Sequence, residues 1–426
     1  MSEPAAAPRA RGVGGFGADT TTWAVAATLL VAGLACLASP NFHAGFDPAR
    51  GPLGGDFLQE WIGGYVVRSG QAARLYDGPY VRALEHDARL IGFDWSGERY
   101  LPMVYPPFYY ALVSPLSLLP LGAAAVVWAA MMILFLAATQ VLLARGLEGP
   151  GGRSAWLWPC AVLFAPLVQS LTSGQKGTVL LFLFAATYVL FRRGRPFGAG
   201  VVFGLLAFKP QLTLVIGAAM LAKGQWRFVA GAAATVAVLV LASLATGADA
   251  CRDYLAFSAR AADYLRTAGY ELAESHSWYG FFHLLLGDAS DTAIRLSAAG
   301  AVAATLAAVA WLLWGRLETC SGRFAVQYSG LMIATLLVSP HLFTYDLTVL
   351  VLPAMLGGLE HGRHAWSGDR WARRIVLATV ALLVVCAAST PVARLVGIQA
   401  SVAAMFATVV LLAAARGRLC PAALFS

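Results

Sequence analysis

Residues 196–222 read PFGAGVVFGLLAFKPQLTLVIGAAMLA, an apolar run that is interrupted only by Phe208-Lys209-Pro210-Gln211. About 20 consecutive apolar residues are needed to cross a bilayer as one helix. A proline breaks an α-helix, and a charged side chain inside a membrane is costly. The run is therefore either one broken span or two short spans, 196–208 and 211–222, and the choice decides the topology of the whole chain.

The composition of the chain places this run within a membrane protein. Of 426 residues, 59% are apolar and 12% are charged, and the mean hydropathy is +0.69. A soluble globular protein carries about 25% charged residues. These values exclude a soluble enzyme, a disordered chain, a fibrous repeat and a soluble domain with a single membrane anchor. The predicted fold class is an all-α polytopic membrane protein.

Other apolar runs with few charges mark the remaining spans. The first, residues 22–39, could pass for a signal peptide, but the long segment before it and the many spans after it favour an uncleaved first helix. The other predicted spans are 121–143, 156–170, 177–191, 226–246, 291–314, 324–338, 345–359, 372–390 and 397–415.

The distribution of charge chooses between the two interpretations of 196–222. We let that run cross twice and let residues 105–120 form a juxtamembrane helix that does not cross. One side then holds 17 basic and 6 acidic residues, and the other holds 13 basic and 16 acidic residues. Because cytoplasmic loops collect Arg and Lys, this predicts twelve crossings with both termini in the cytoplasm. The same rule explains the net charge of +8 without a nucleic-acid partner.

The predicted organisation is a single membrane domain, residues 22–415, between cytoplasmic tails at 1–21 and 416–426. Two long loops, 40–104 and 247–290, fall on the outer side, whereas the inner loops are short. The abundance of Ala, Gly and Arg suggests a bacterial source. Any chemistry is therefore expected on the extracytoplasmic face of a bacterial inner membrane.

Asp56 and Glu60 are the acidic candidates in the first outer loop. They lie in Gly54-Gly55-Asp56-Phe57-Leu58-Gln59-Glu60-Trp61, and the pattern up to Arg68 predicts a helix on the membrane surface. Four residues apart, the two carboxylates share one face of that helix. A carboxylate beside a membrane-facing cleft can accept the proton of a hydroxyl. The alternative is that Asp56 caps the N-terminus of the helix.

Lys209 and Lys176 are the cationic candidates, because each lies in or beside an apolar run. An intramembrane cation is usually functional and could hold a phosphate. The alternative for Lys209 is that its ammonium extends to the membrane interface. The alternative for Lys176 is a solvated helix terminus.

Two further polar stretches lie in predicted outer segments. His341 and Asp346 belong to Ser339-Pro340-His341-Leu342-Phe343-Thr344-Tyr345-Asp346, where a histidine and backbone donors suit an anion. The second stretch, Ser275-His276-Ser277-Trp278-Tyr279-Gly280-Phe281-Phe282, holds aromatic side chains that could stack on a sugar. The alternatives are a plain interfacial turn and an interfacial aromatic belt.

Nucleotide and zinc motifs are missing from the sequence. It contains no P-loop, no GxGxxG between a strand and a helix, and no CxxC among its six cysteines. The inner loops are too short to bind a nucleotide. An outward-facing transferase would therefore need an activated donor that reaches it through the membrane, such as a polyprenyl-phosphate sugar.

Several short motifs, in order between about residues 20 and 415, together resemble glycosyltransferase family 87, the polyprenyl-phosphate-mannose-dependent α-mannosyltransferases of the GT-C fold class. The matching motifs are Gly55-Asp56-Phe57, Leu75-Tyr76-Asp77, Tyr105-Pro106-Pro107-Phe108, Ser173-Gly174-Gln175, Arg192-Arg193-Gly194-Arg195, Lys209-Pro210 and Ser339-Pro340-His341. The sequence departs from the family where Lys176 and Gly177 follow Gly-Gln in place of the usual Asn. It departs again where Ser275-His276-Ser277 replaces an Asn-rich motif.

The resemblance implies a mechanism and a set of site residues. Asp56 matches the acidic residue that acts as general base, which would activate an acceptor hydroxyl for a single inverting displacement at the anomeric carbon. Basic donors would stabilise the lipid phosphate that leaves, and no metal or other cofactor is required. The donor-phosphate candidates are Lys209, His341, Lys176 and Gln175. The candidates for contacts with the sugar or acceptor are Glu60, Tyr105, His276, Trp278, Tyr279, Tyr345 and Asp346.

Two other function classes remain open at this point. Twelve spans with a broken helix also suit a transporter or lipid flippase. A polymerase or ligase of surface glycans would likewise use a lipid-linked donor. The leading hypothesis is transfer of a hexose, with mannose the first choice, to a lipid or glycan acceptor. The sequence leaves the sugar, acceptor, linkage and oligomeric state open.

Overall fold

The structure is a computed structural model, and it describes residues 20–39, 55–95, 100–148, 157–267, 271–287, 289–362 and 368–418. In these ranges the regular structure is helical throughout, and the isolated bridge joins Ser275 to Phe343. The all-α fold class predicted from the composition is therefore confirmed. Most of the tails at 1–21 and 416–426 lies outside the described residues, as do residues 40–54 and 96–99 of the loop 40–104.

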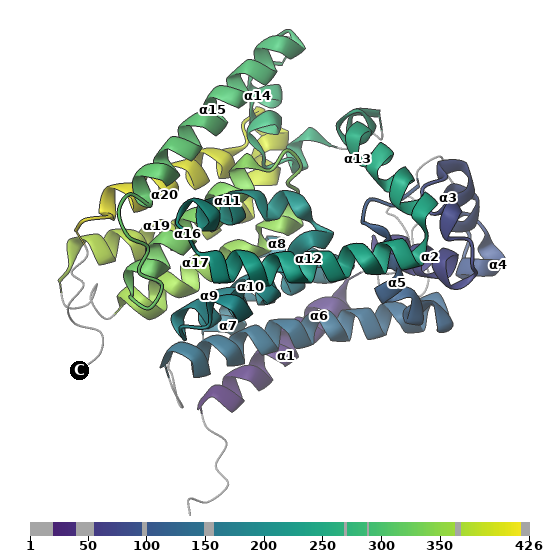
Figure 1. Cartoon of the computed structure of the whole chain (residues 1–426), viewed down its shortest axis with the longest axis horizontal. Coiled ribbons are helices and arrows are strands. Elements are labelled where there is room, and N and C mark those ends of the chain that lie inside the picture. The colour runs from purple at the N-terminus through teal and green to yellow at the C-terminus, as the bar shows by residue number, and fades with distance from the viewer. Residues whose placement is uncertain are drawn as a thin grey trace, which may run out of the picture.

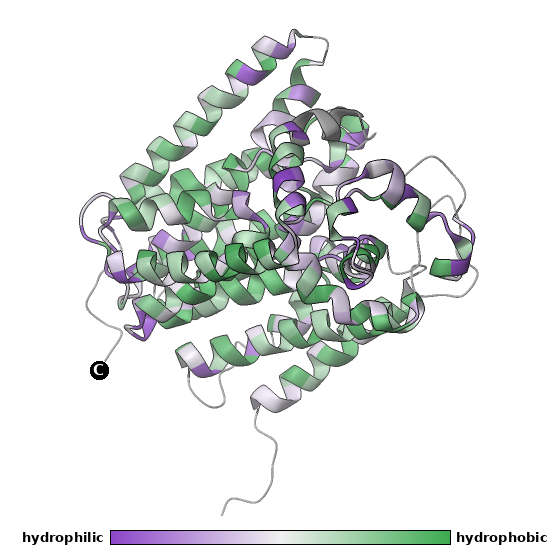
Figure 2. Cartoon of the chain, turned by 45° about the vertical axis from the view of Figure 1, so that its right-hand side comes forward, coloured by the Kyte–Doolittle hydropathy of each residue, from purple (hydrophilic) through white to green (hydrophobic). Residues whose placement is uncertain are grey.

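Five described helices are long and apolar enough to cross a membrane. They are α1 (Thr20–Ala38), α6 (Leu121–Leu143), α12 (Trp226–Thr246), α15 (Asp291–Leu312) and α19 (Arg370–Val396). Figure 1 shows α6 and α12 running along the long axis of the molecule and α1 lying obliquely to them, and Figure 2 shows apolar residues covering the long helices. Their lengths follow from uncharged runs that match the thickness of the hydrocarbon layer.

Shorter helices pack between and beside these five. They are α9 (Gly177–Arg192), α10 (Pro196–Gly204), α11 (Leu214–Ala222), α16 (Arg323–Val338), α17 (Val351–Leu356) and α20 (Ala400–Ala415). Among the described residues, a sixth span is reached only if two bent helices count as one. The twelve crossings expected from the charges are therefore not confirmed and stay a prediction.

Two predicted spans are not continuous α-helices. The segment 156–170 is divided into α7 (Leu157–Ala161) and α8 (Ala165–Thr172), and α8 meets α9 at an angle of 118°. Pro166 in the first turn of α8 explains the division, because proline cannot continue a preceding helix. The segment 345–359 is a 3-10 turn (Thr344–Leu350), then α17, then a π-helical turn (Gly357–His361).

The run 196–222 forms two short helices, α10 and α11, and the expectation that each crosses the membrane stays a prediction. Glycines explain how α10 packs against α12. A Cβ atom at Gly200 would lie 2.0 Å from the carbonyl oxygen of Phe228, and one at Gly231 would lie 2.2 Å from that of Phe197. Only glycine permits so close an approach of two backbones. A 3-10 turn (Leu205–Phe208) then follows α10 and leads into Lys209.

A group of short helices gathers at one end of the molecule, at the right of Figure 1. Its short members are α2 (Phe57–Arg68), α3 (Gly78–Glu85), α4 (Ala88–Ile91) and α5 (Pro107–Val113), with 3-10 turns at Ala72–Arg74 and Ser114–Leu118. The longer helix α13 (Ala248–Thr267) lies beside them. The region 105–120 is thus a short helix and turn, which agrees with the expectation that it does not cross. The 3-10 turn Leu272–Glu274 and α14 (Trp278–Leu286) continue the second outer loop.

Helix α2 is enclosed by its neighbours, and its expected position at the membrane surface stays a prediction. Nine of its twelve residues are buried. A Cβ atom at Gly63 would lie 2.1 Å from the ring of Tyr110, and one at Gly64 would lie 2.9 Å from the backbone of Ser114. These two glycines let α5 and the turn after it cover α2, a consequence that the helical pattern alone does not reveal.

Three contacts of basic side chains involve segments that the charge pattern assigns to the same side of the membrane. At one end, Lys223 donates to the carbonyl of Gly315, and Arg416 donates to that of Trp311. At the other end, Arg394 pairs with Glu271 in the second outer loop. Residues that the charge pattern assigns to one side therefore contact one another in these pairs.

Candidate active site

The N-terminus of α2 meets the turn between α8 and α9. The backbone N–H of Asp56 donates to the carbonyl of Ser173 at 2.9 Å. Gly55 adopts a φ of +65°, and a Cβ atom there would lie 2.8 Å from the backbone of Ser173. Glycine before Asp56 is thus needed both for its conformation and for the close approach. The Gly-Asp motif and the Ser-Gly-Gln motif of the sequence form one site.

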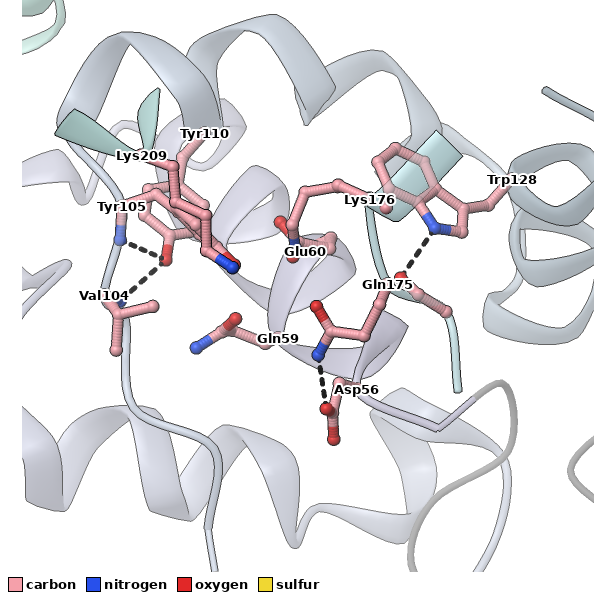
Figure 3. Close-up of polar contacts among 12 residues, drawn as sticks. Asp56, Gln59, Glu60, Val104, Tyr105, Tyr110, Trp128, Gln175, Lys176 and Lys209 are labelled. Carbon is pink, nitrogen blue, oxygen red and sulfur yellow. Dashed lines mark hydrogen bonds and ion pairs between the residues drawn. The ribbon is translucent and has the colours of Figure 1, made fainter. Parts of the chain in front are cut away.

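Asp56 occupies the N-cap position of α2, but its side chain makes no capping hydrogen bond. Instead, Oδ2 accepts a hydrogen bond from Nε2 of Gln175 (Figure 3). The helix-cap alternative is therefore wrong. Asp56 itself keeps an intermediate exposure. Burial of the carboxylate raises the pKa of Asp56, and the Gln175 hydrogen bond and the charge of Lys176 oppose that rise.

Lys176 and Glu60 form a buried ion pair beside Asp56. Nζ of Lys176 donates to Oε1 of Glu60, and the two side chains are 3% and 0% exposed. The ammonium also lies 4.2 Å from the ring centroid of Tyr105 and 5.6 Å from that of Tyr109. Burial disfavours the charge of Lys176, but the attraction of Glu60 outweighs it and raises the pKa of the lysine. The solvated-terminus alternative is wrong.

The turn between α8 and α9, which carries Gln175 and Lys176, is fixed by a hydrogen bond and by close packing. Nε1 of Trp128 donates to the carbonyl of Gly174 at 2.8 Å (Figure 3). A Cβ atom at Gly177 would lie 2.5 Å from Oγ of Ser170 and 2.9 Å from Oγ1 of Thr348. Gly177, which departs from the family pattern, therefore fits a space that no side chain could share.

A second buried ion pair joins Lys209 to Asp346. Nζ of Lys209 donates to Oδ1, and the backbone N–H of Phe343 donates to Oδ2 at 3.3 Å. The side chains are 10% and 2% exposed, and the ammonium lies 5.1 Å from the ring centroid of Tyr345. The alternative in which Lys209 extends to solvent is therefore wrong. The pair fixes the break between α10 and α11 to the turn before α17.

His341 lies beside this second pair and is half-buried. Burial and the charge of Lys209 lower its pKa to about 4. The imidazole is therefore neutral near pH 7 and can offer an anion a hydrogen bond rather than a full positive charge. The carbonyl of His341 accepts a hydrogen bond from Oγ of Ser339 at 2.8 Å, which fixes the turn.

The charged groups follow an order through the site. The charge of Lys176 acts on the carboxylate of Asp56, and Lys176 pairs with Glu60. The charges of both members of that pair act on the ammonium of Lys209. Lys209 in turn acts on His341. Five of the sequence candidates thus form one row, with a partly exposed carboxylate, Asp56, at one end and a lysine–histidine group, Lys209 with His341, at the other. Such a row suits a reaction that needs a base and an anion-binding site.

The second outer loop runs beside this row, since the backbone N–H of His276 donates to the carbonyl of Leu342. The ring of His276 is buried and is hydrogen-bonded to the hydroxyls of Ser401 and Thr344. Burial lowers the pKa of His276 to about 3. Trp278 is also buried and donates to Thr305 at 3.0 Å. These two side chains are committed to helix packing, so their role in substrate binding stays a prediction.

Tyr279 lies apart from those packing contacts. It is half-buried, and its hydroxyl bonds to Asp291 at 3.4 Å. Its role in substrate binding also stays a prediction.

Three acidic or phenolic groups near the row were not predicted. Glu85 is fully buried and accepts a hydrogen bond from the backbone N–H of Leu101 at 2.8 Å, and the charge of Asp56 acts on it. The charge of Asp56 also acts on Glu274, which pairs with Arg394 at 3.2 Å. Tyr109 directly follows the motif that ends at Phe108, and Glu274 directly precedes the motif that begins at Ser275. Their positions next to these motifs could have indicated them. Glu85 has no such signal.

The described residues contain no group of three or more His, Cys, Asp or Glu side chains that could hold a metal ion. The chemistry available to them consists of proton acceptance by Asp56 and binding of an anion near Lys209 and His341. Both are elements of a displacement reaction with an anionic leaving group.

Comparison with known proteins identifies the family. Residues 103–340 match glycosyltransferase family 87. The chain is 30% identical over 327 residues to a polyprenol-phosphate-mannose-dependent α-(1-2)-phosphatidylinositol pentamannoside mannosyltransferase of Mycolicibacterium smegmatis, a match that covers 75% of this chain and 73% of the relative. It is 28% identical to the protein of the same name from Mycobacterium tuberculosis, with 61% of each chain covered.

The chain is also similar to solved structures of ArnT from Cupriavidus metallidurans. The structure bound to undecaprenyl phosphate is 17% identical, with a TM-score of 0.39 and with 92% of this chain and 77% of that chain covered. The apo structure is 16% identical, with a TM-score of 0.40 and with 92% and 76% covered. The family match over more than half of the chain and the mycobacterial relatives settle the classification that the sequence motifs suggested: this membrane protein belongs to glycosyltransferase family 87.

Proposed function

We propose that the protein transfers mannose from a polyprenyl-phosphate donor to a hydroxyl group of a lipid or glycan acceptor on the outer face of the inner membrane. The donor class is supported by the names of the mycobacterial relatives, which specify polyprenol-phosphate mannose. It is also supported by Lys209 and His341, which lie next to apolar helices that a lipid chain could follow.

The observation that supports this function most strongly is the arrangement around Asp56. It is a carboxylate with intermediate exposure, held by Gln175 at one end of a row whose other end is Lys209 with His341. A base and an anion site at opposite ends of one row suit an in-line displacement, because the nucleophile and leaving group must lie on opposite faces of the reacting carbon.

The mechanism is a single displacement. Asp56 accepts the proton of the acceptor hydroxyl as its oxygen attacks the anomeric carbon. The bond from that carbon to the phosphate oxygen breaks, and its electron pair stays on the polyprenyl phosphate. Lys209 and His341 stabilise the leaving phosphate with a charge and a hydrogen bond. The products are the glycosylated acceptor with inverted configuration, polyprenyl phosphate and a proton released from Asp56.

No cofactor enters this scheme, and the lipid-linked sugar is a co-substrate. The remaining candidates have assigned places in it. Tyr105 lies beside Lys176 in the middle of the row, and Tyr345 and Asp346 lie beside Lys209 at its end. All three are proposed to contact the sugar or to hold the residues that do. Membership of a glycosyltransferase family favours this scheme over a transporter or flippase.

The function is tested with purified protein in nanodiscs and three possible donors: polyprenyl-phosphate mannose, polyprenyl-phosphate glucose and GDP-mannose. A lipid extract and an alkyl mannoside serve as acceptors. We expect a mannosylated product with the first donor alone. Transfer from GDP-mannose would overturn the lipid-donor assignment, and transfer from the glucosyl lipid alone would overturn the choice of mannose. Product of retained configuration would contradict the single displacement.

A further inference from the structure

The two buried lysines of the site have different surroundings. Lys176 pairs with a carboxylate that is 0% exposed, and its ammonium faces the rings of both Tyr105 and Tyr109. Lys209 has a side chain that is 10% exposed and faces the half-buried ring of Tyr345. The enclosure of Lys176 leaves little room for a phosphate, whereas Lys209, although it also pairs with a buried carboxylate, lies beside the half-buried side chains of His341 and Tyr345.

Lys176 is also part of a two-point clasp. Gln175 and Lys176 are consecutive, and they bind Asp56 and Glu60, which lie one helical turn apart at the start of α2 (Figure 3). The clasp joins segments more than a hundred residues apart in the chain. Since Lys176 anchors the turn to Glu60, it also determines where the amide of Gln175 meets the carboxylate of Asp56.

Three acidic side chains also lie within electrostatic reach of Asp56. Its charge interacts with Glu60 on its own helix, with Glu85 at the end of α3 and with Glu274 in the turn before α14. Lys176 is the cation that acts on Asp56 among the described residues. Removing that cation would take away the charge that opposes the rise in the pKa of Asp56, and it would leave the carboxylate of Glu60 unpaired one helical turn away. A neighbouring like charge favours protonation of a carboxylate. A protonated Asp56 could not serve as base.

We propose that Lys176 is a positioning residue for Asp56, with Glu60 as its anchor, and that Lys209 rather than Lys176 meets the donor phosphate. The proposal rests on the proposed function and refines it, because the resemblance assigns both lysines to the phosphate. It also gives a physical role to the position where this chain departs from the family's usual Asn.

The first test separates the two lysines by kinetics. The chain has three lysines, and Lys223, which contacts the carbonyl of Gly315 at the opposite end, provides the matched control. We expect Lys176→Gln to move the acidic limb of the kcat/KM profile to higher pH by about one unit, with little change in donor KM. We expect Lys209→Gln to raise the donor KM about tenfold or more without moving the acidic limb of the kcat/KM profile. We expect Lys223→Gln to change neither the donor KM nor the position of that limb. A large rise in donor KM for Lys176→Gln with an unmoved limb would overturn the proposal.

The second test guards against misfolding, because a buried carboxylate that loses its partner destabilises a protein. In the double variant Glu60→Gln with Lys176→Gln, both charges are removed together. We expect this variant to fold and to show a smaller limb shift than Lys176→Gln, since one acidic neighbour of Asp56 has also gone. A double variant with the same shift as the single variant, or a larger one, would contradict the role of Glu60.

The third test does not depend on turnover. A water-soluble carbodiimide labels protonated carboxyl groups, and mass spectrometry of the Asp56 peptide reports its labelling against pH. We expect labelling to persist to higher pH in Lys176→Gln than in wild type. Unchanged labelling would overturn the proposal even if the enzyme uses a different donor. Binding of undecaprenyl phosphate to the wild type is measured in parallel, and its absence would count against the proposed function instead.

Discussion

The side-chain amide of Gln175 donates a hydrogen bond to the carboxylate of Asp56, although 119 residues separate the two in sequence. The carboxylate of Asp56 makes no capping hydrogen bond to the backbone N–H groups of α2. It is therefore a candidate base rather than a helix cap. The hydrogen bond from Gln175 orients one carboxylate oxygen, which leaves the other for the acceptor hydroxyl. In the proposed mechanism, the amide therefore sets the direction from which the acceptor hydroxyl approaches Asp56.

Replacing Gln175 by alanine removes this orienting bond. A hydrogen bond to a charged group contributes about 1.5–3 kcal/mol, so we expect kcat/KM to fall by about ten- to a hundredfold. Initial rates with saturating acceptor check this, and Gln71→Ala, at an exposed position, is the control. An unchanged rate for Gln175→Ala would show that Asp56 does not depend on the amide.

The pH profile should reveal a carboxylate that is harder to ionise than usual. Burial raises the pKa of Asp56 above the ordinary value of 3.8, and the base must be ionised to accept a proton. Activity should therefore be lost as the pH falls through a value above 3.8, and it should be regained on return to neutral pH. A profile of kcat/KM that stays flat down to pH 4 would contradict this assignment.

The Lys209–Asp346 pair should matter for donor binding more than for proton transfer. Asp346→Asn leaves Lys209 without its carboxylate partner while the backbone bond from Phe343 can persist. We expect donor KM to change several-fold and the acidic limb to stay in place, since Asp56 is at the other end of the row. The measurement is a donor titration at two pH values. A shifted limb with an unchanged donor KM would contradict the order of charges along the row.

Gly55 should be the more sensitive of two glycines with similar backbone conformation. Gly55 and Gly70 have φ of +65° and +72°, but only a Cβ atom at Gly55 would meet a neighbour, the backbone of Ser173 at 2.8 Å. Gly70→Ala should cost about 1–2 kcal/mol of stability and little activity. Gly55→Ala should also separate Asp56 from the turn and lower kcat. Thermal unfolding and turnover of both variants check this, and equal activity losses would contradict it.

The sequence predicts the apolar helices better than their interruptions. The bounds of α6 and α12 agree with the predicted 121–143 and 226–246, because uncharged runs of that length have one favourable arrangement in a bilayer. The division of 156–170 and the enclosure of α2 were not predicted. They depend on Pro166 and on Gly63 and Gly64 meeting distant partners, which periodicity does not show.

The site was predicted as a set of residues but not as an arrangement. Asp56, Lys176 and Lys209 were identifiable because charge is rare in this chain and each lies beside an apolar run. Their pairing with Gln175, Glu60 and Asp346 was not predicted, since those contacts join separate loops. The neutrality of His341 near pH 7 likewise follows from burial and from the neighbouring lysine, which only the fold brings to it.

The most direct test of the central claim is the single-turnover rate of Asp56→Asn with polyprenyl-phosphate mannose as donor. Asp249→Asn, at an exposed outer position, is the matched control. Asparagine is similar in size and cannot act as the base, and loss of a general base typically costs about 10²- to 10⁴-fold in rate. We predict a loss in that range for Asp56→Asn with donor binding retained, and a normal rate for Asp249→Asn. A normal rate for Asp56→Asn would contradict the role of Asp56 and with it the mechanism.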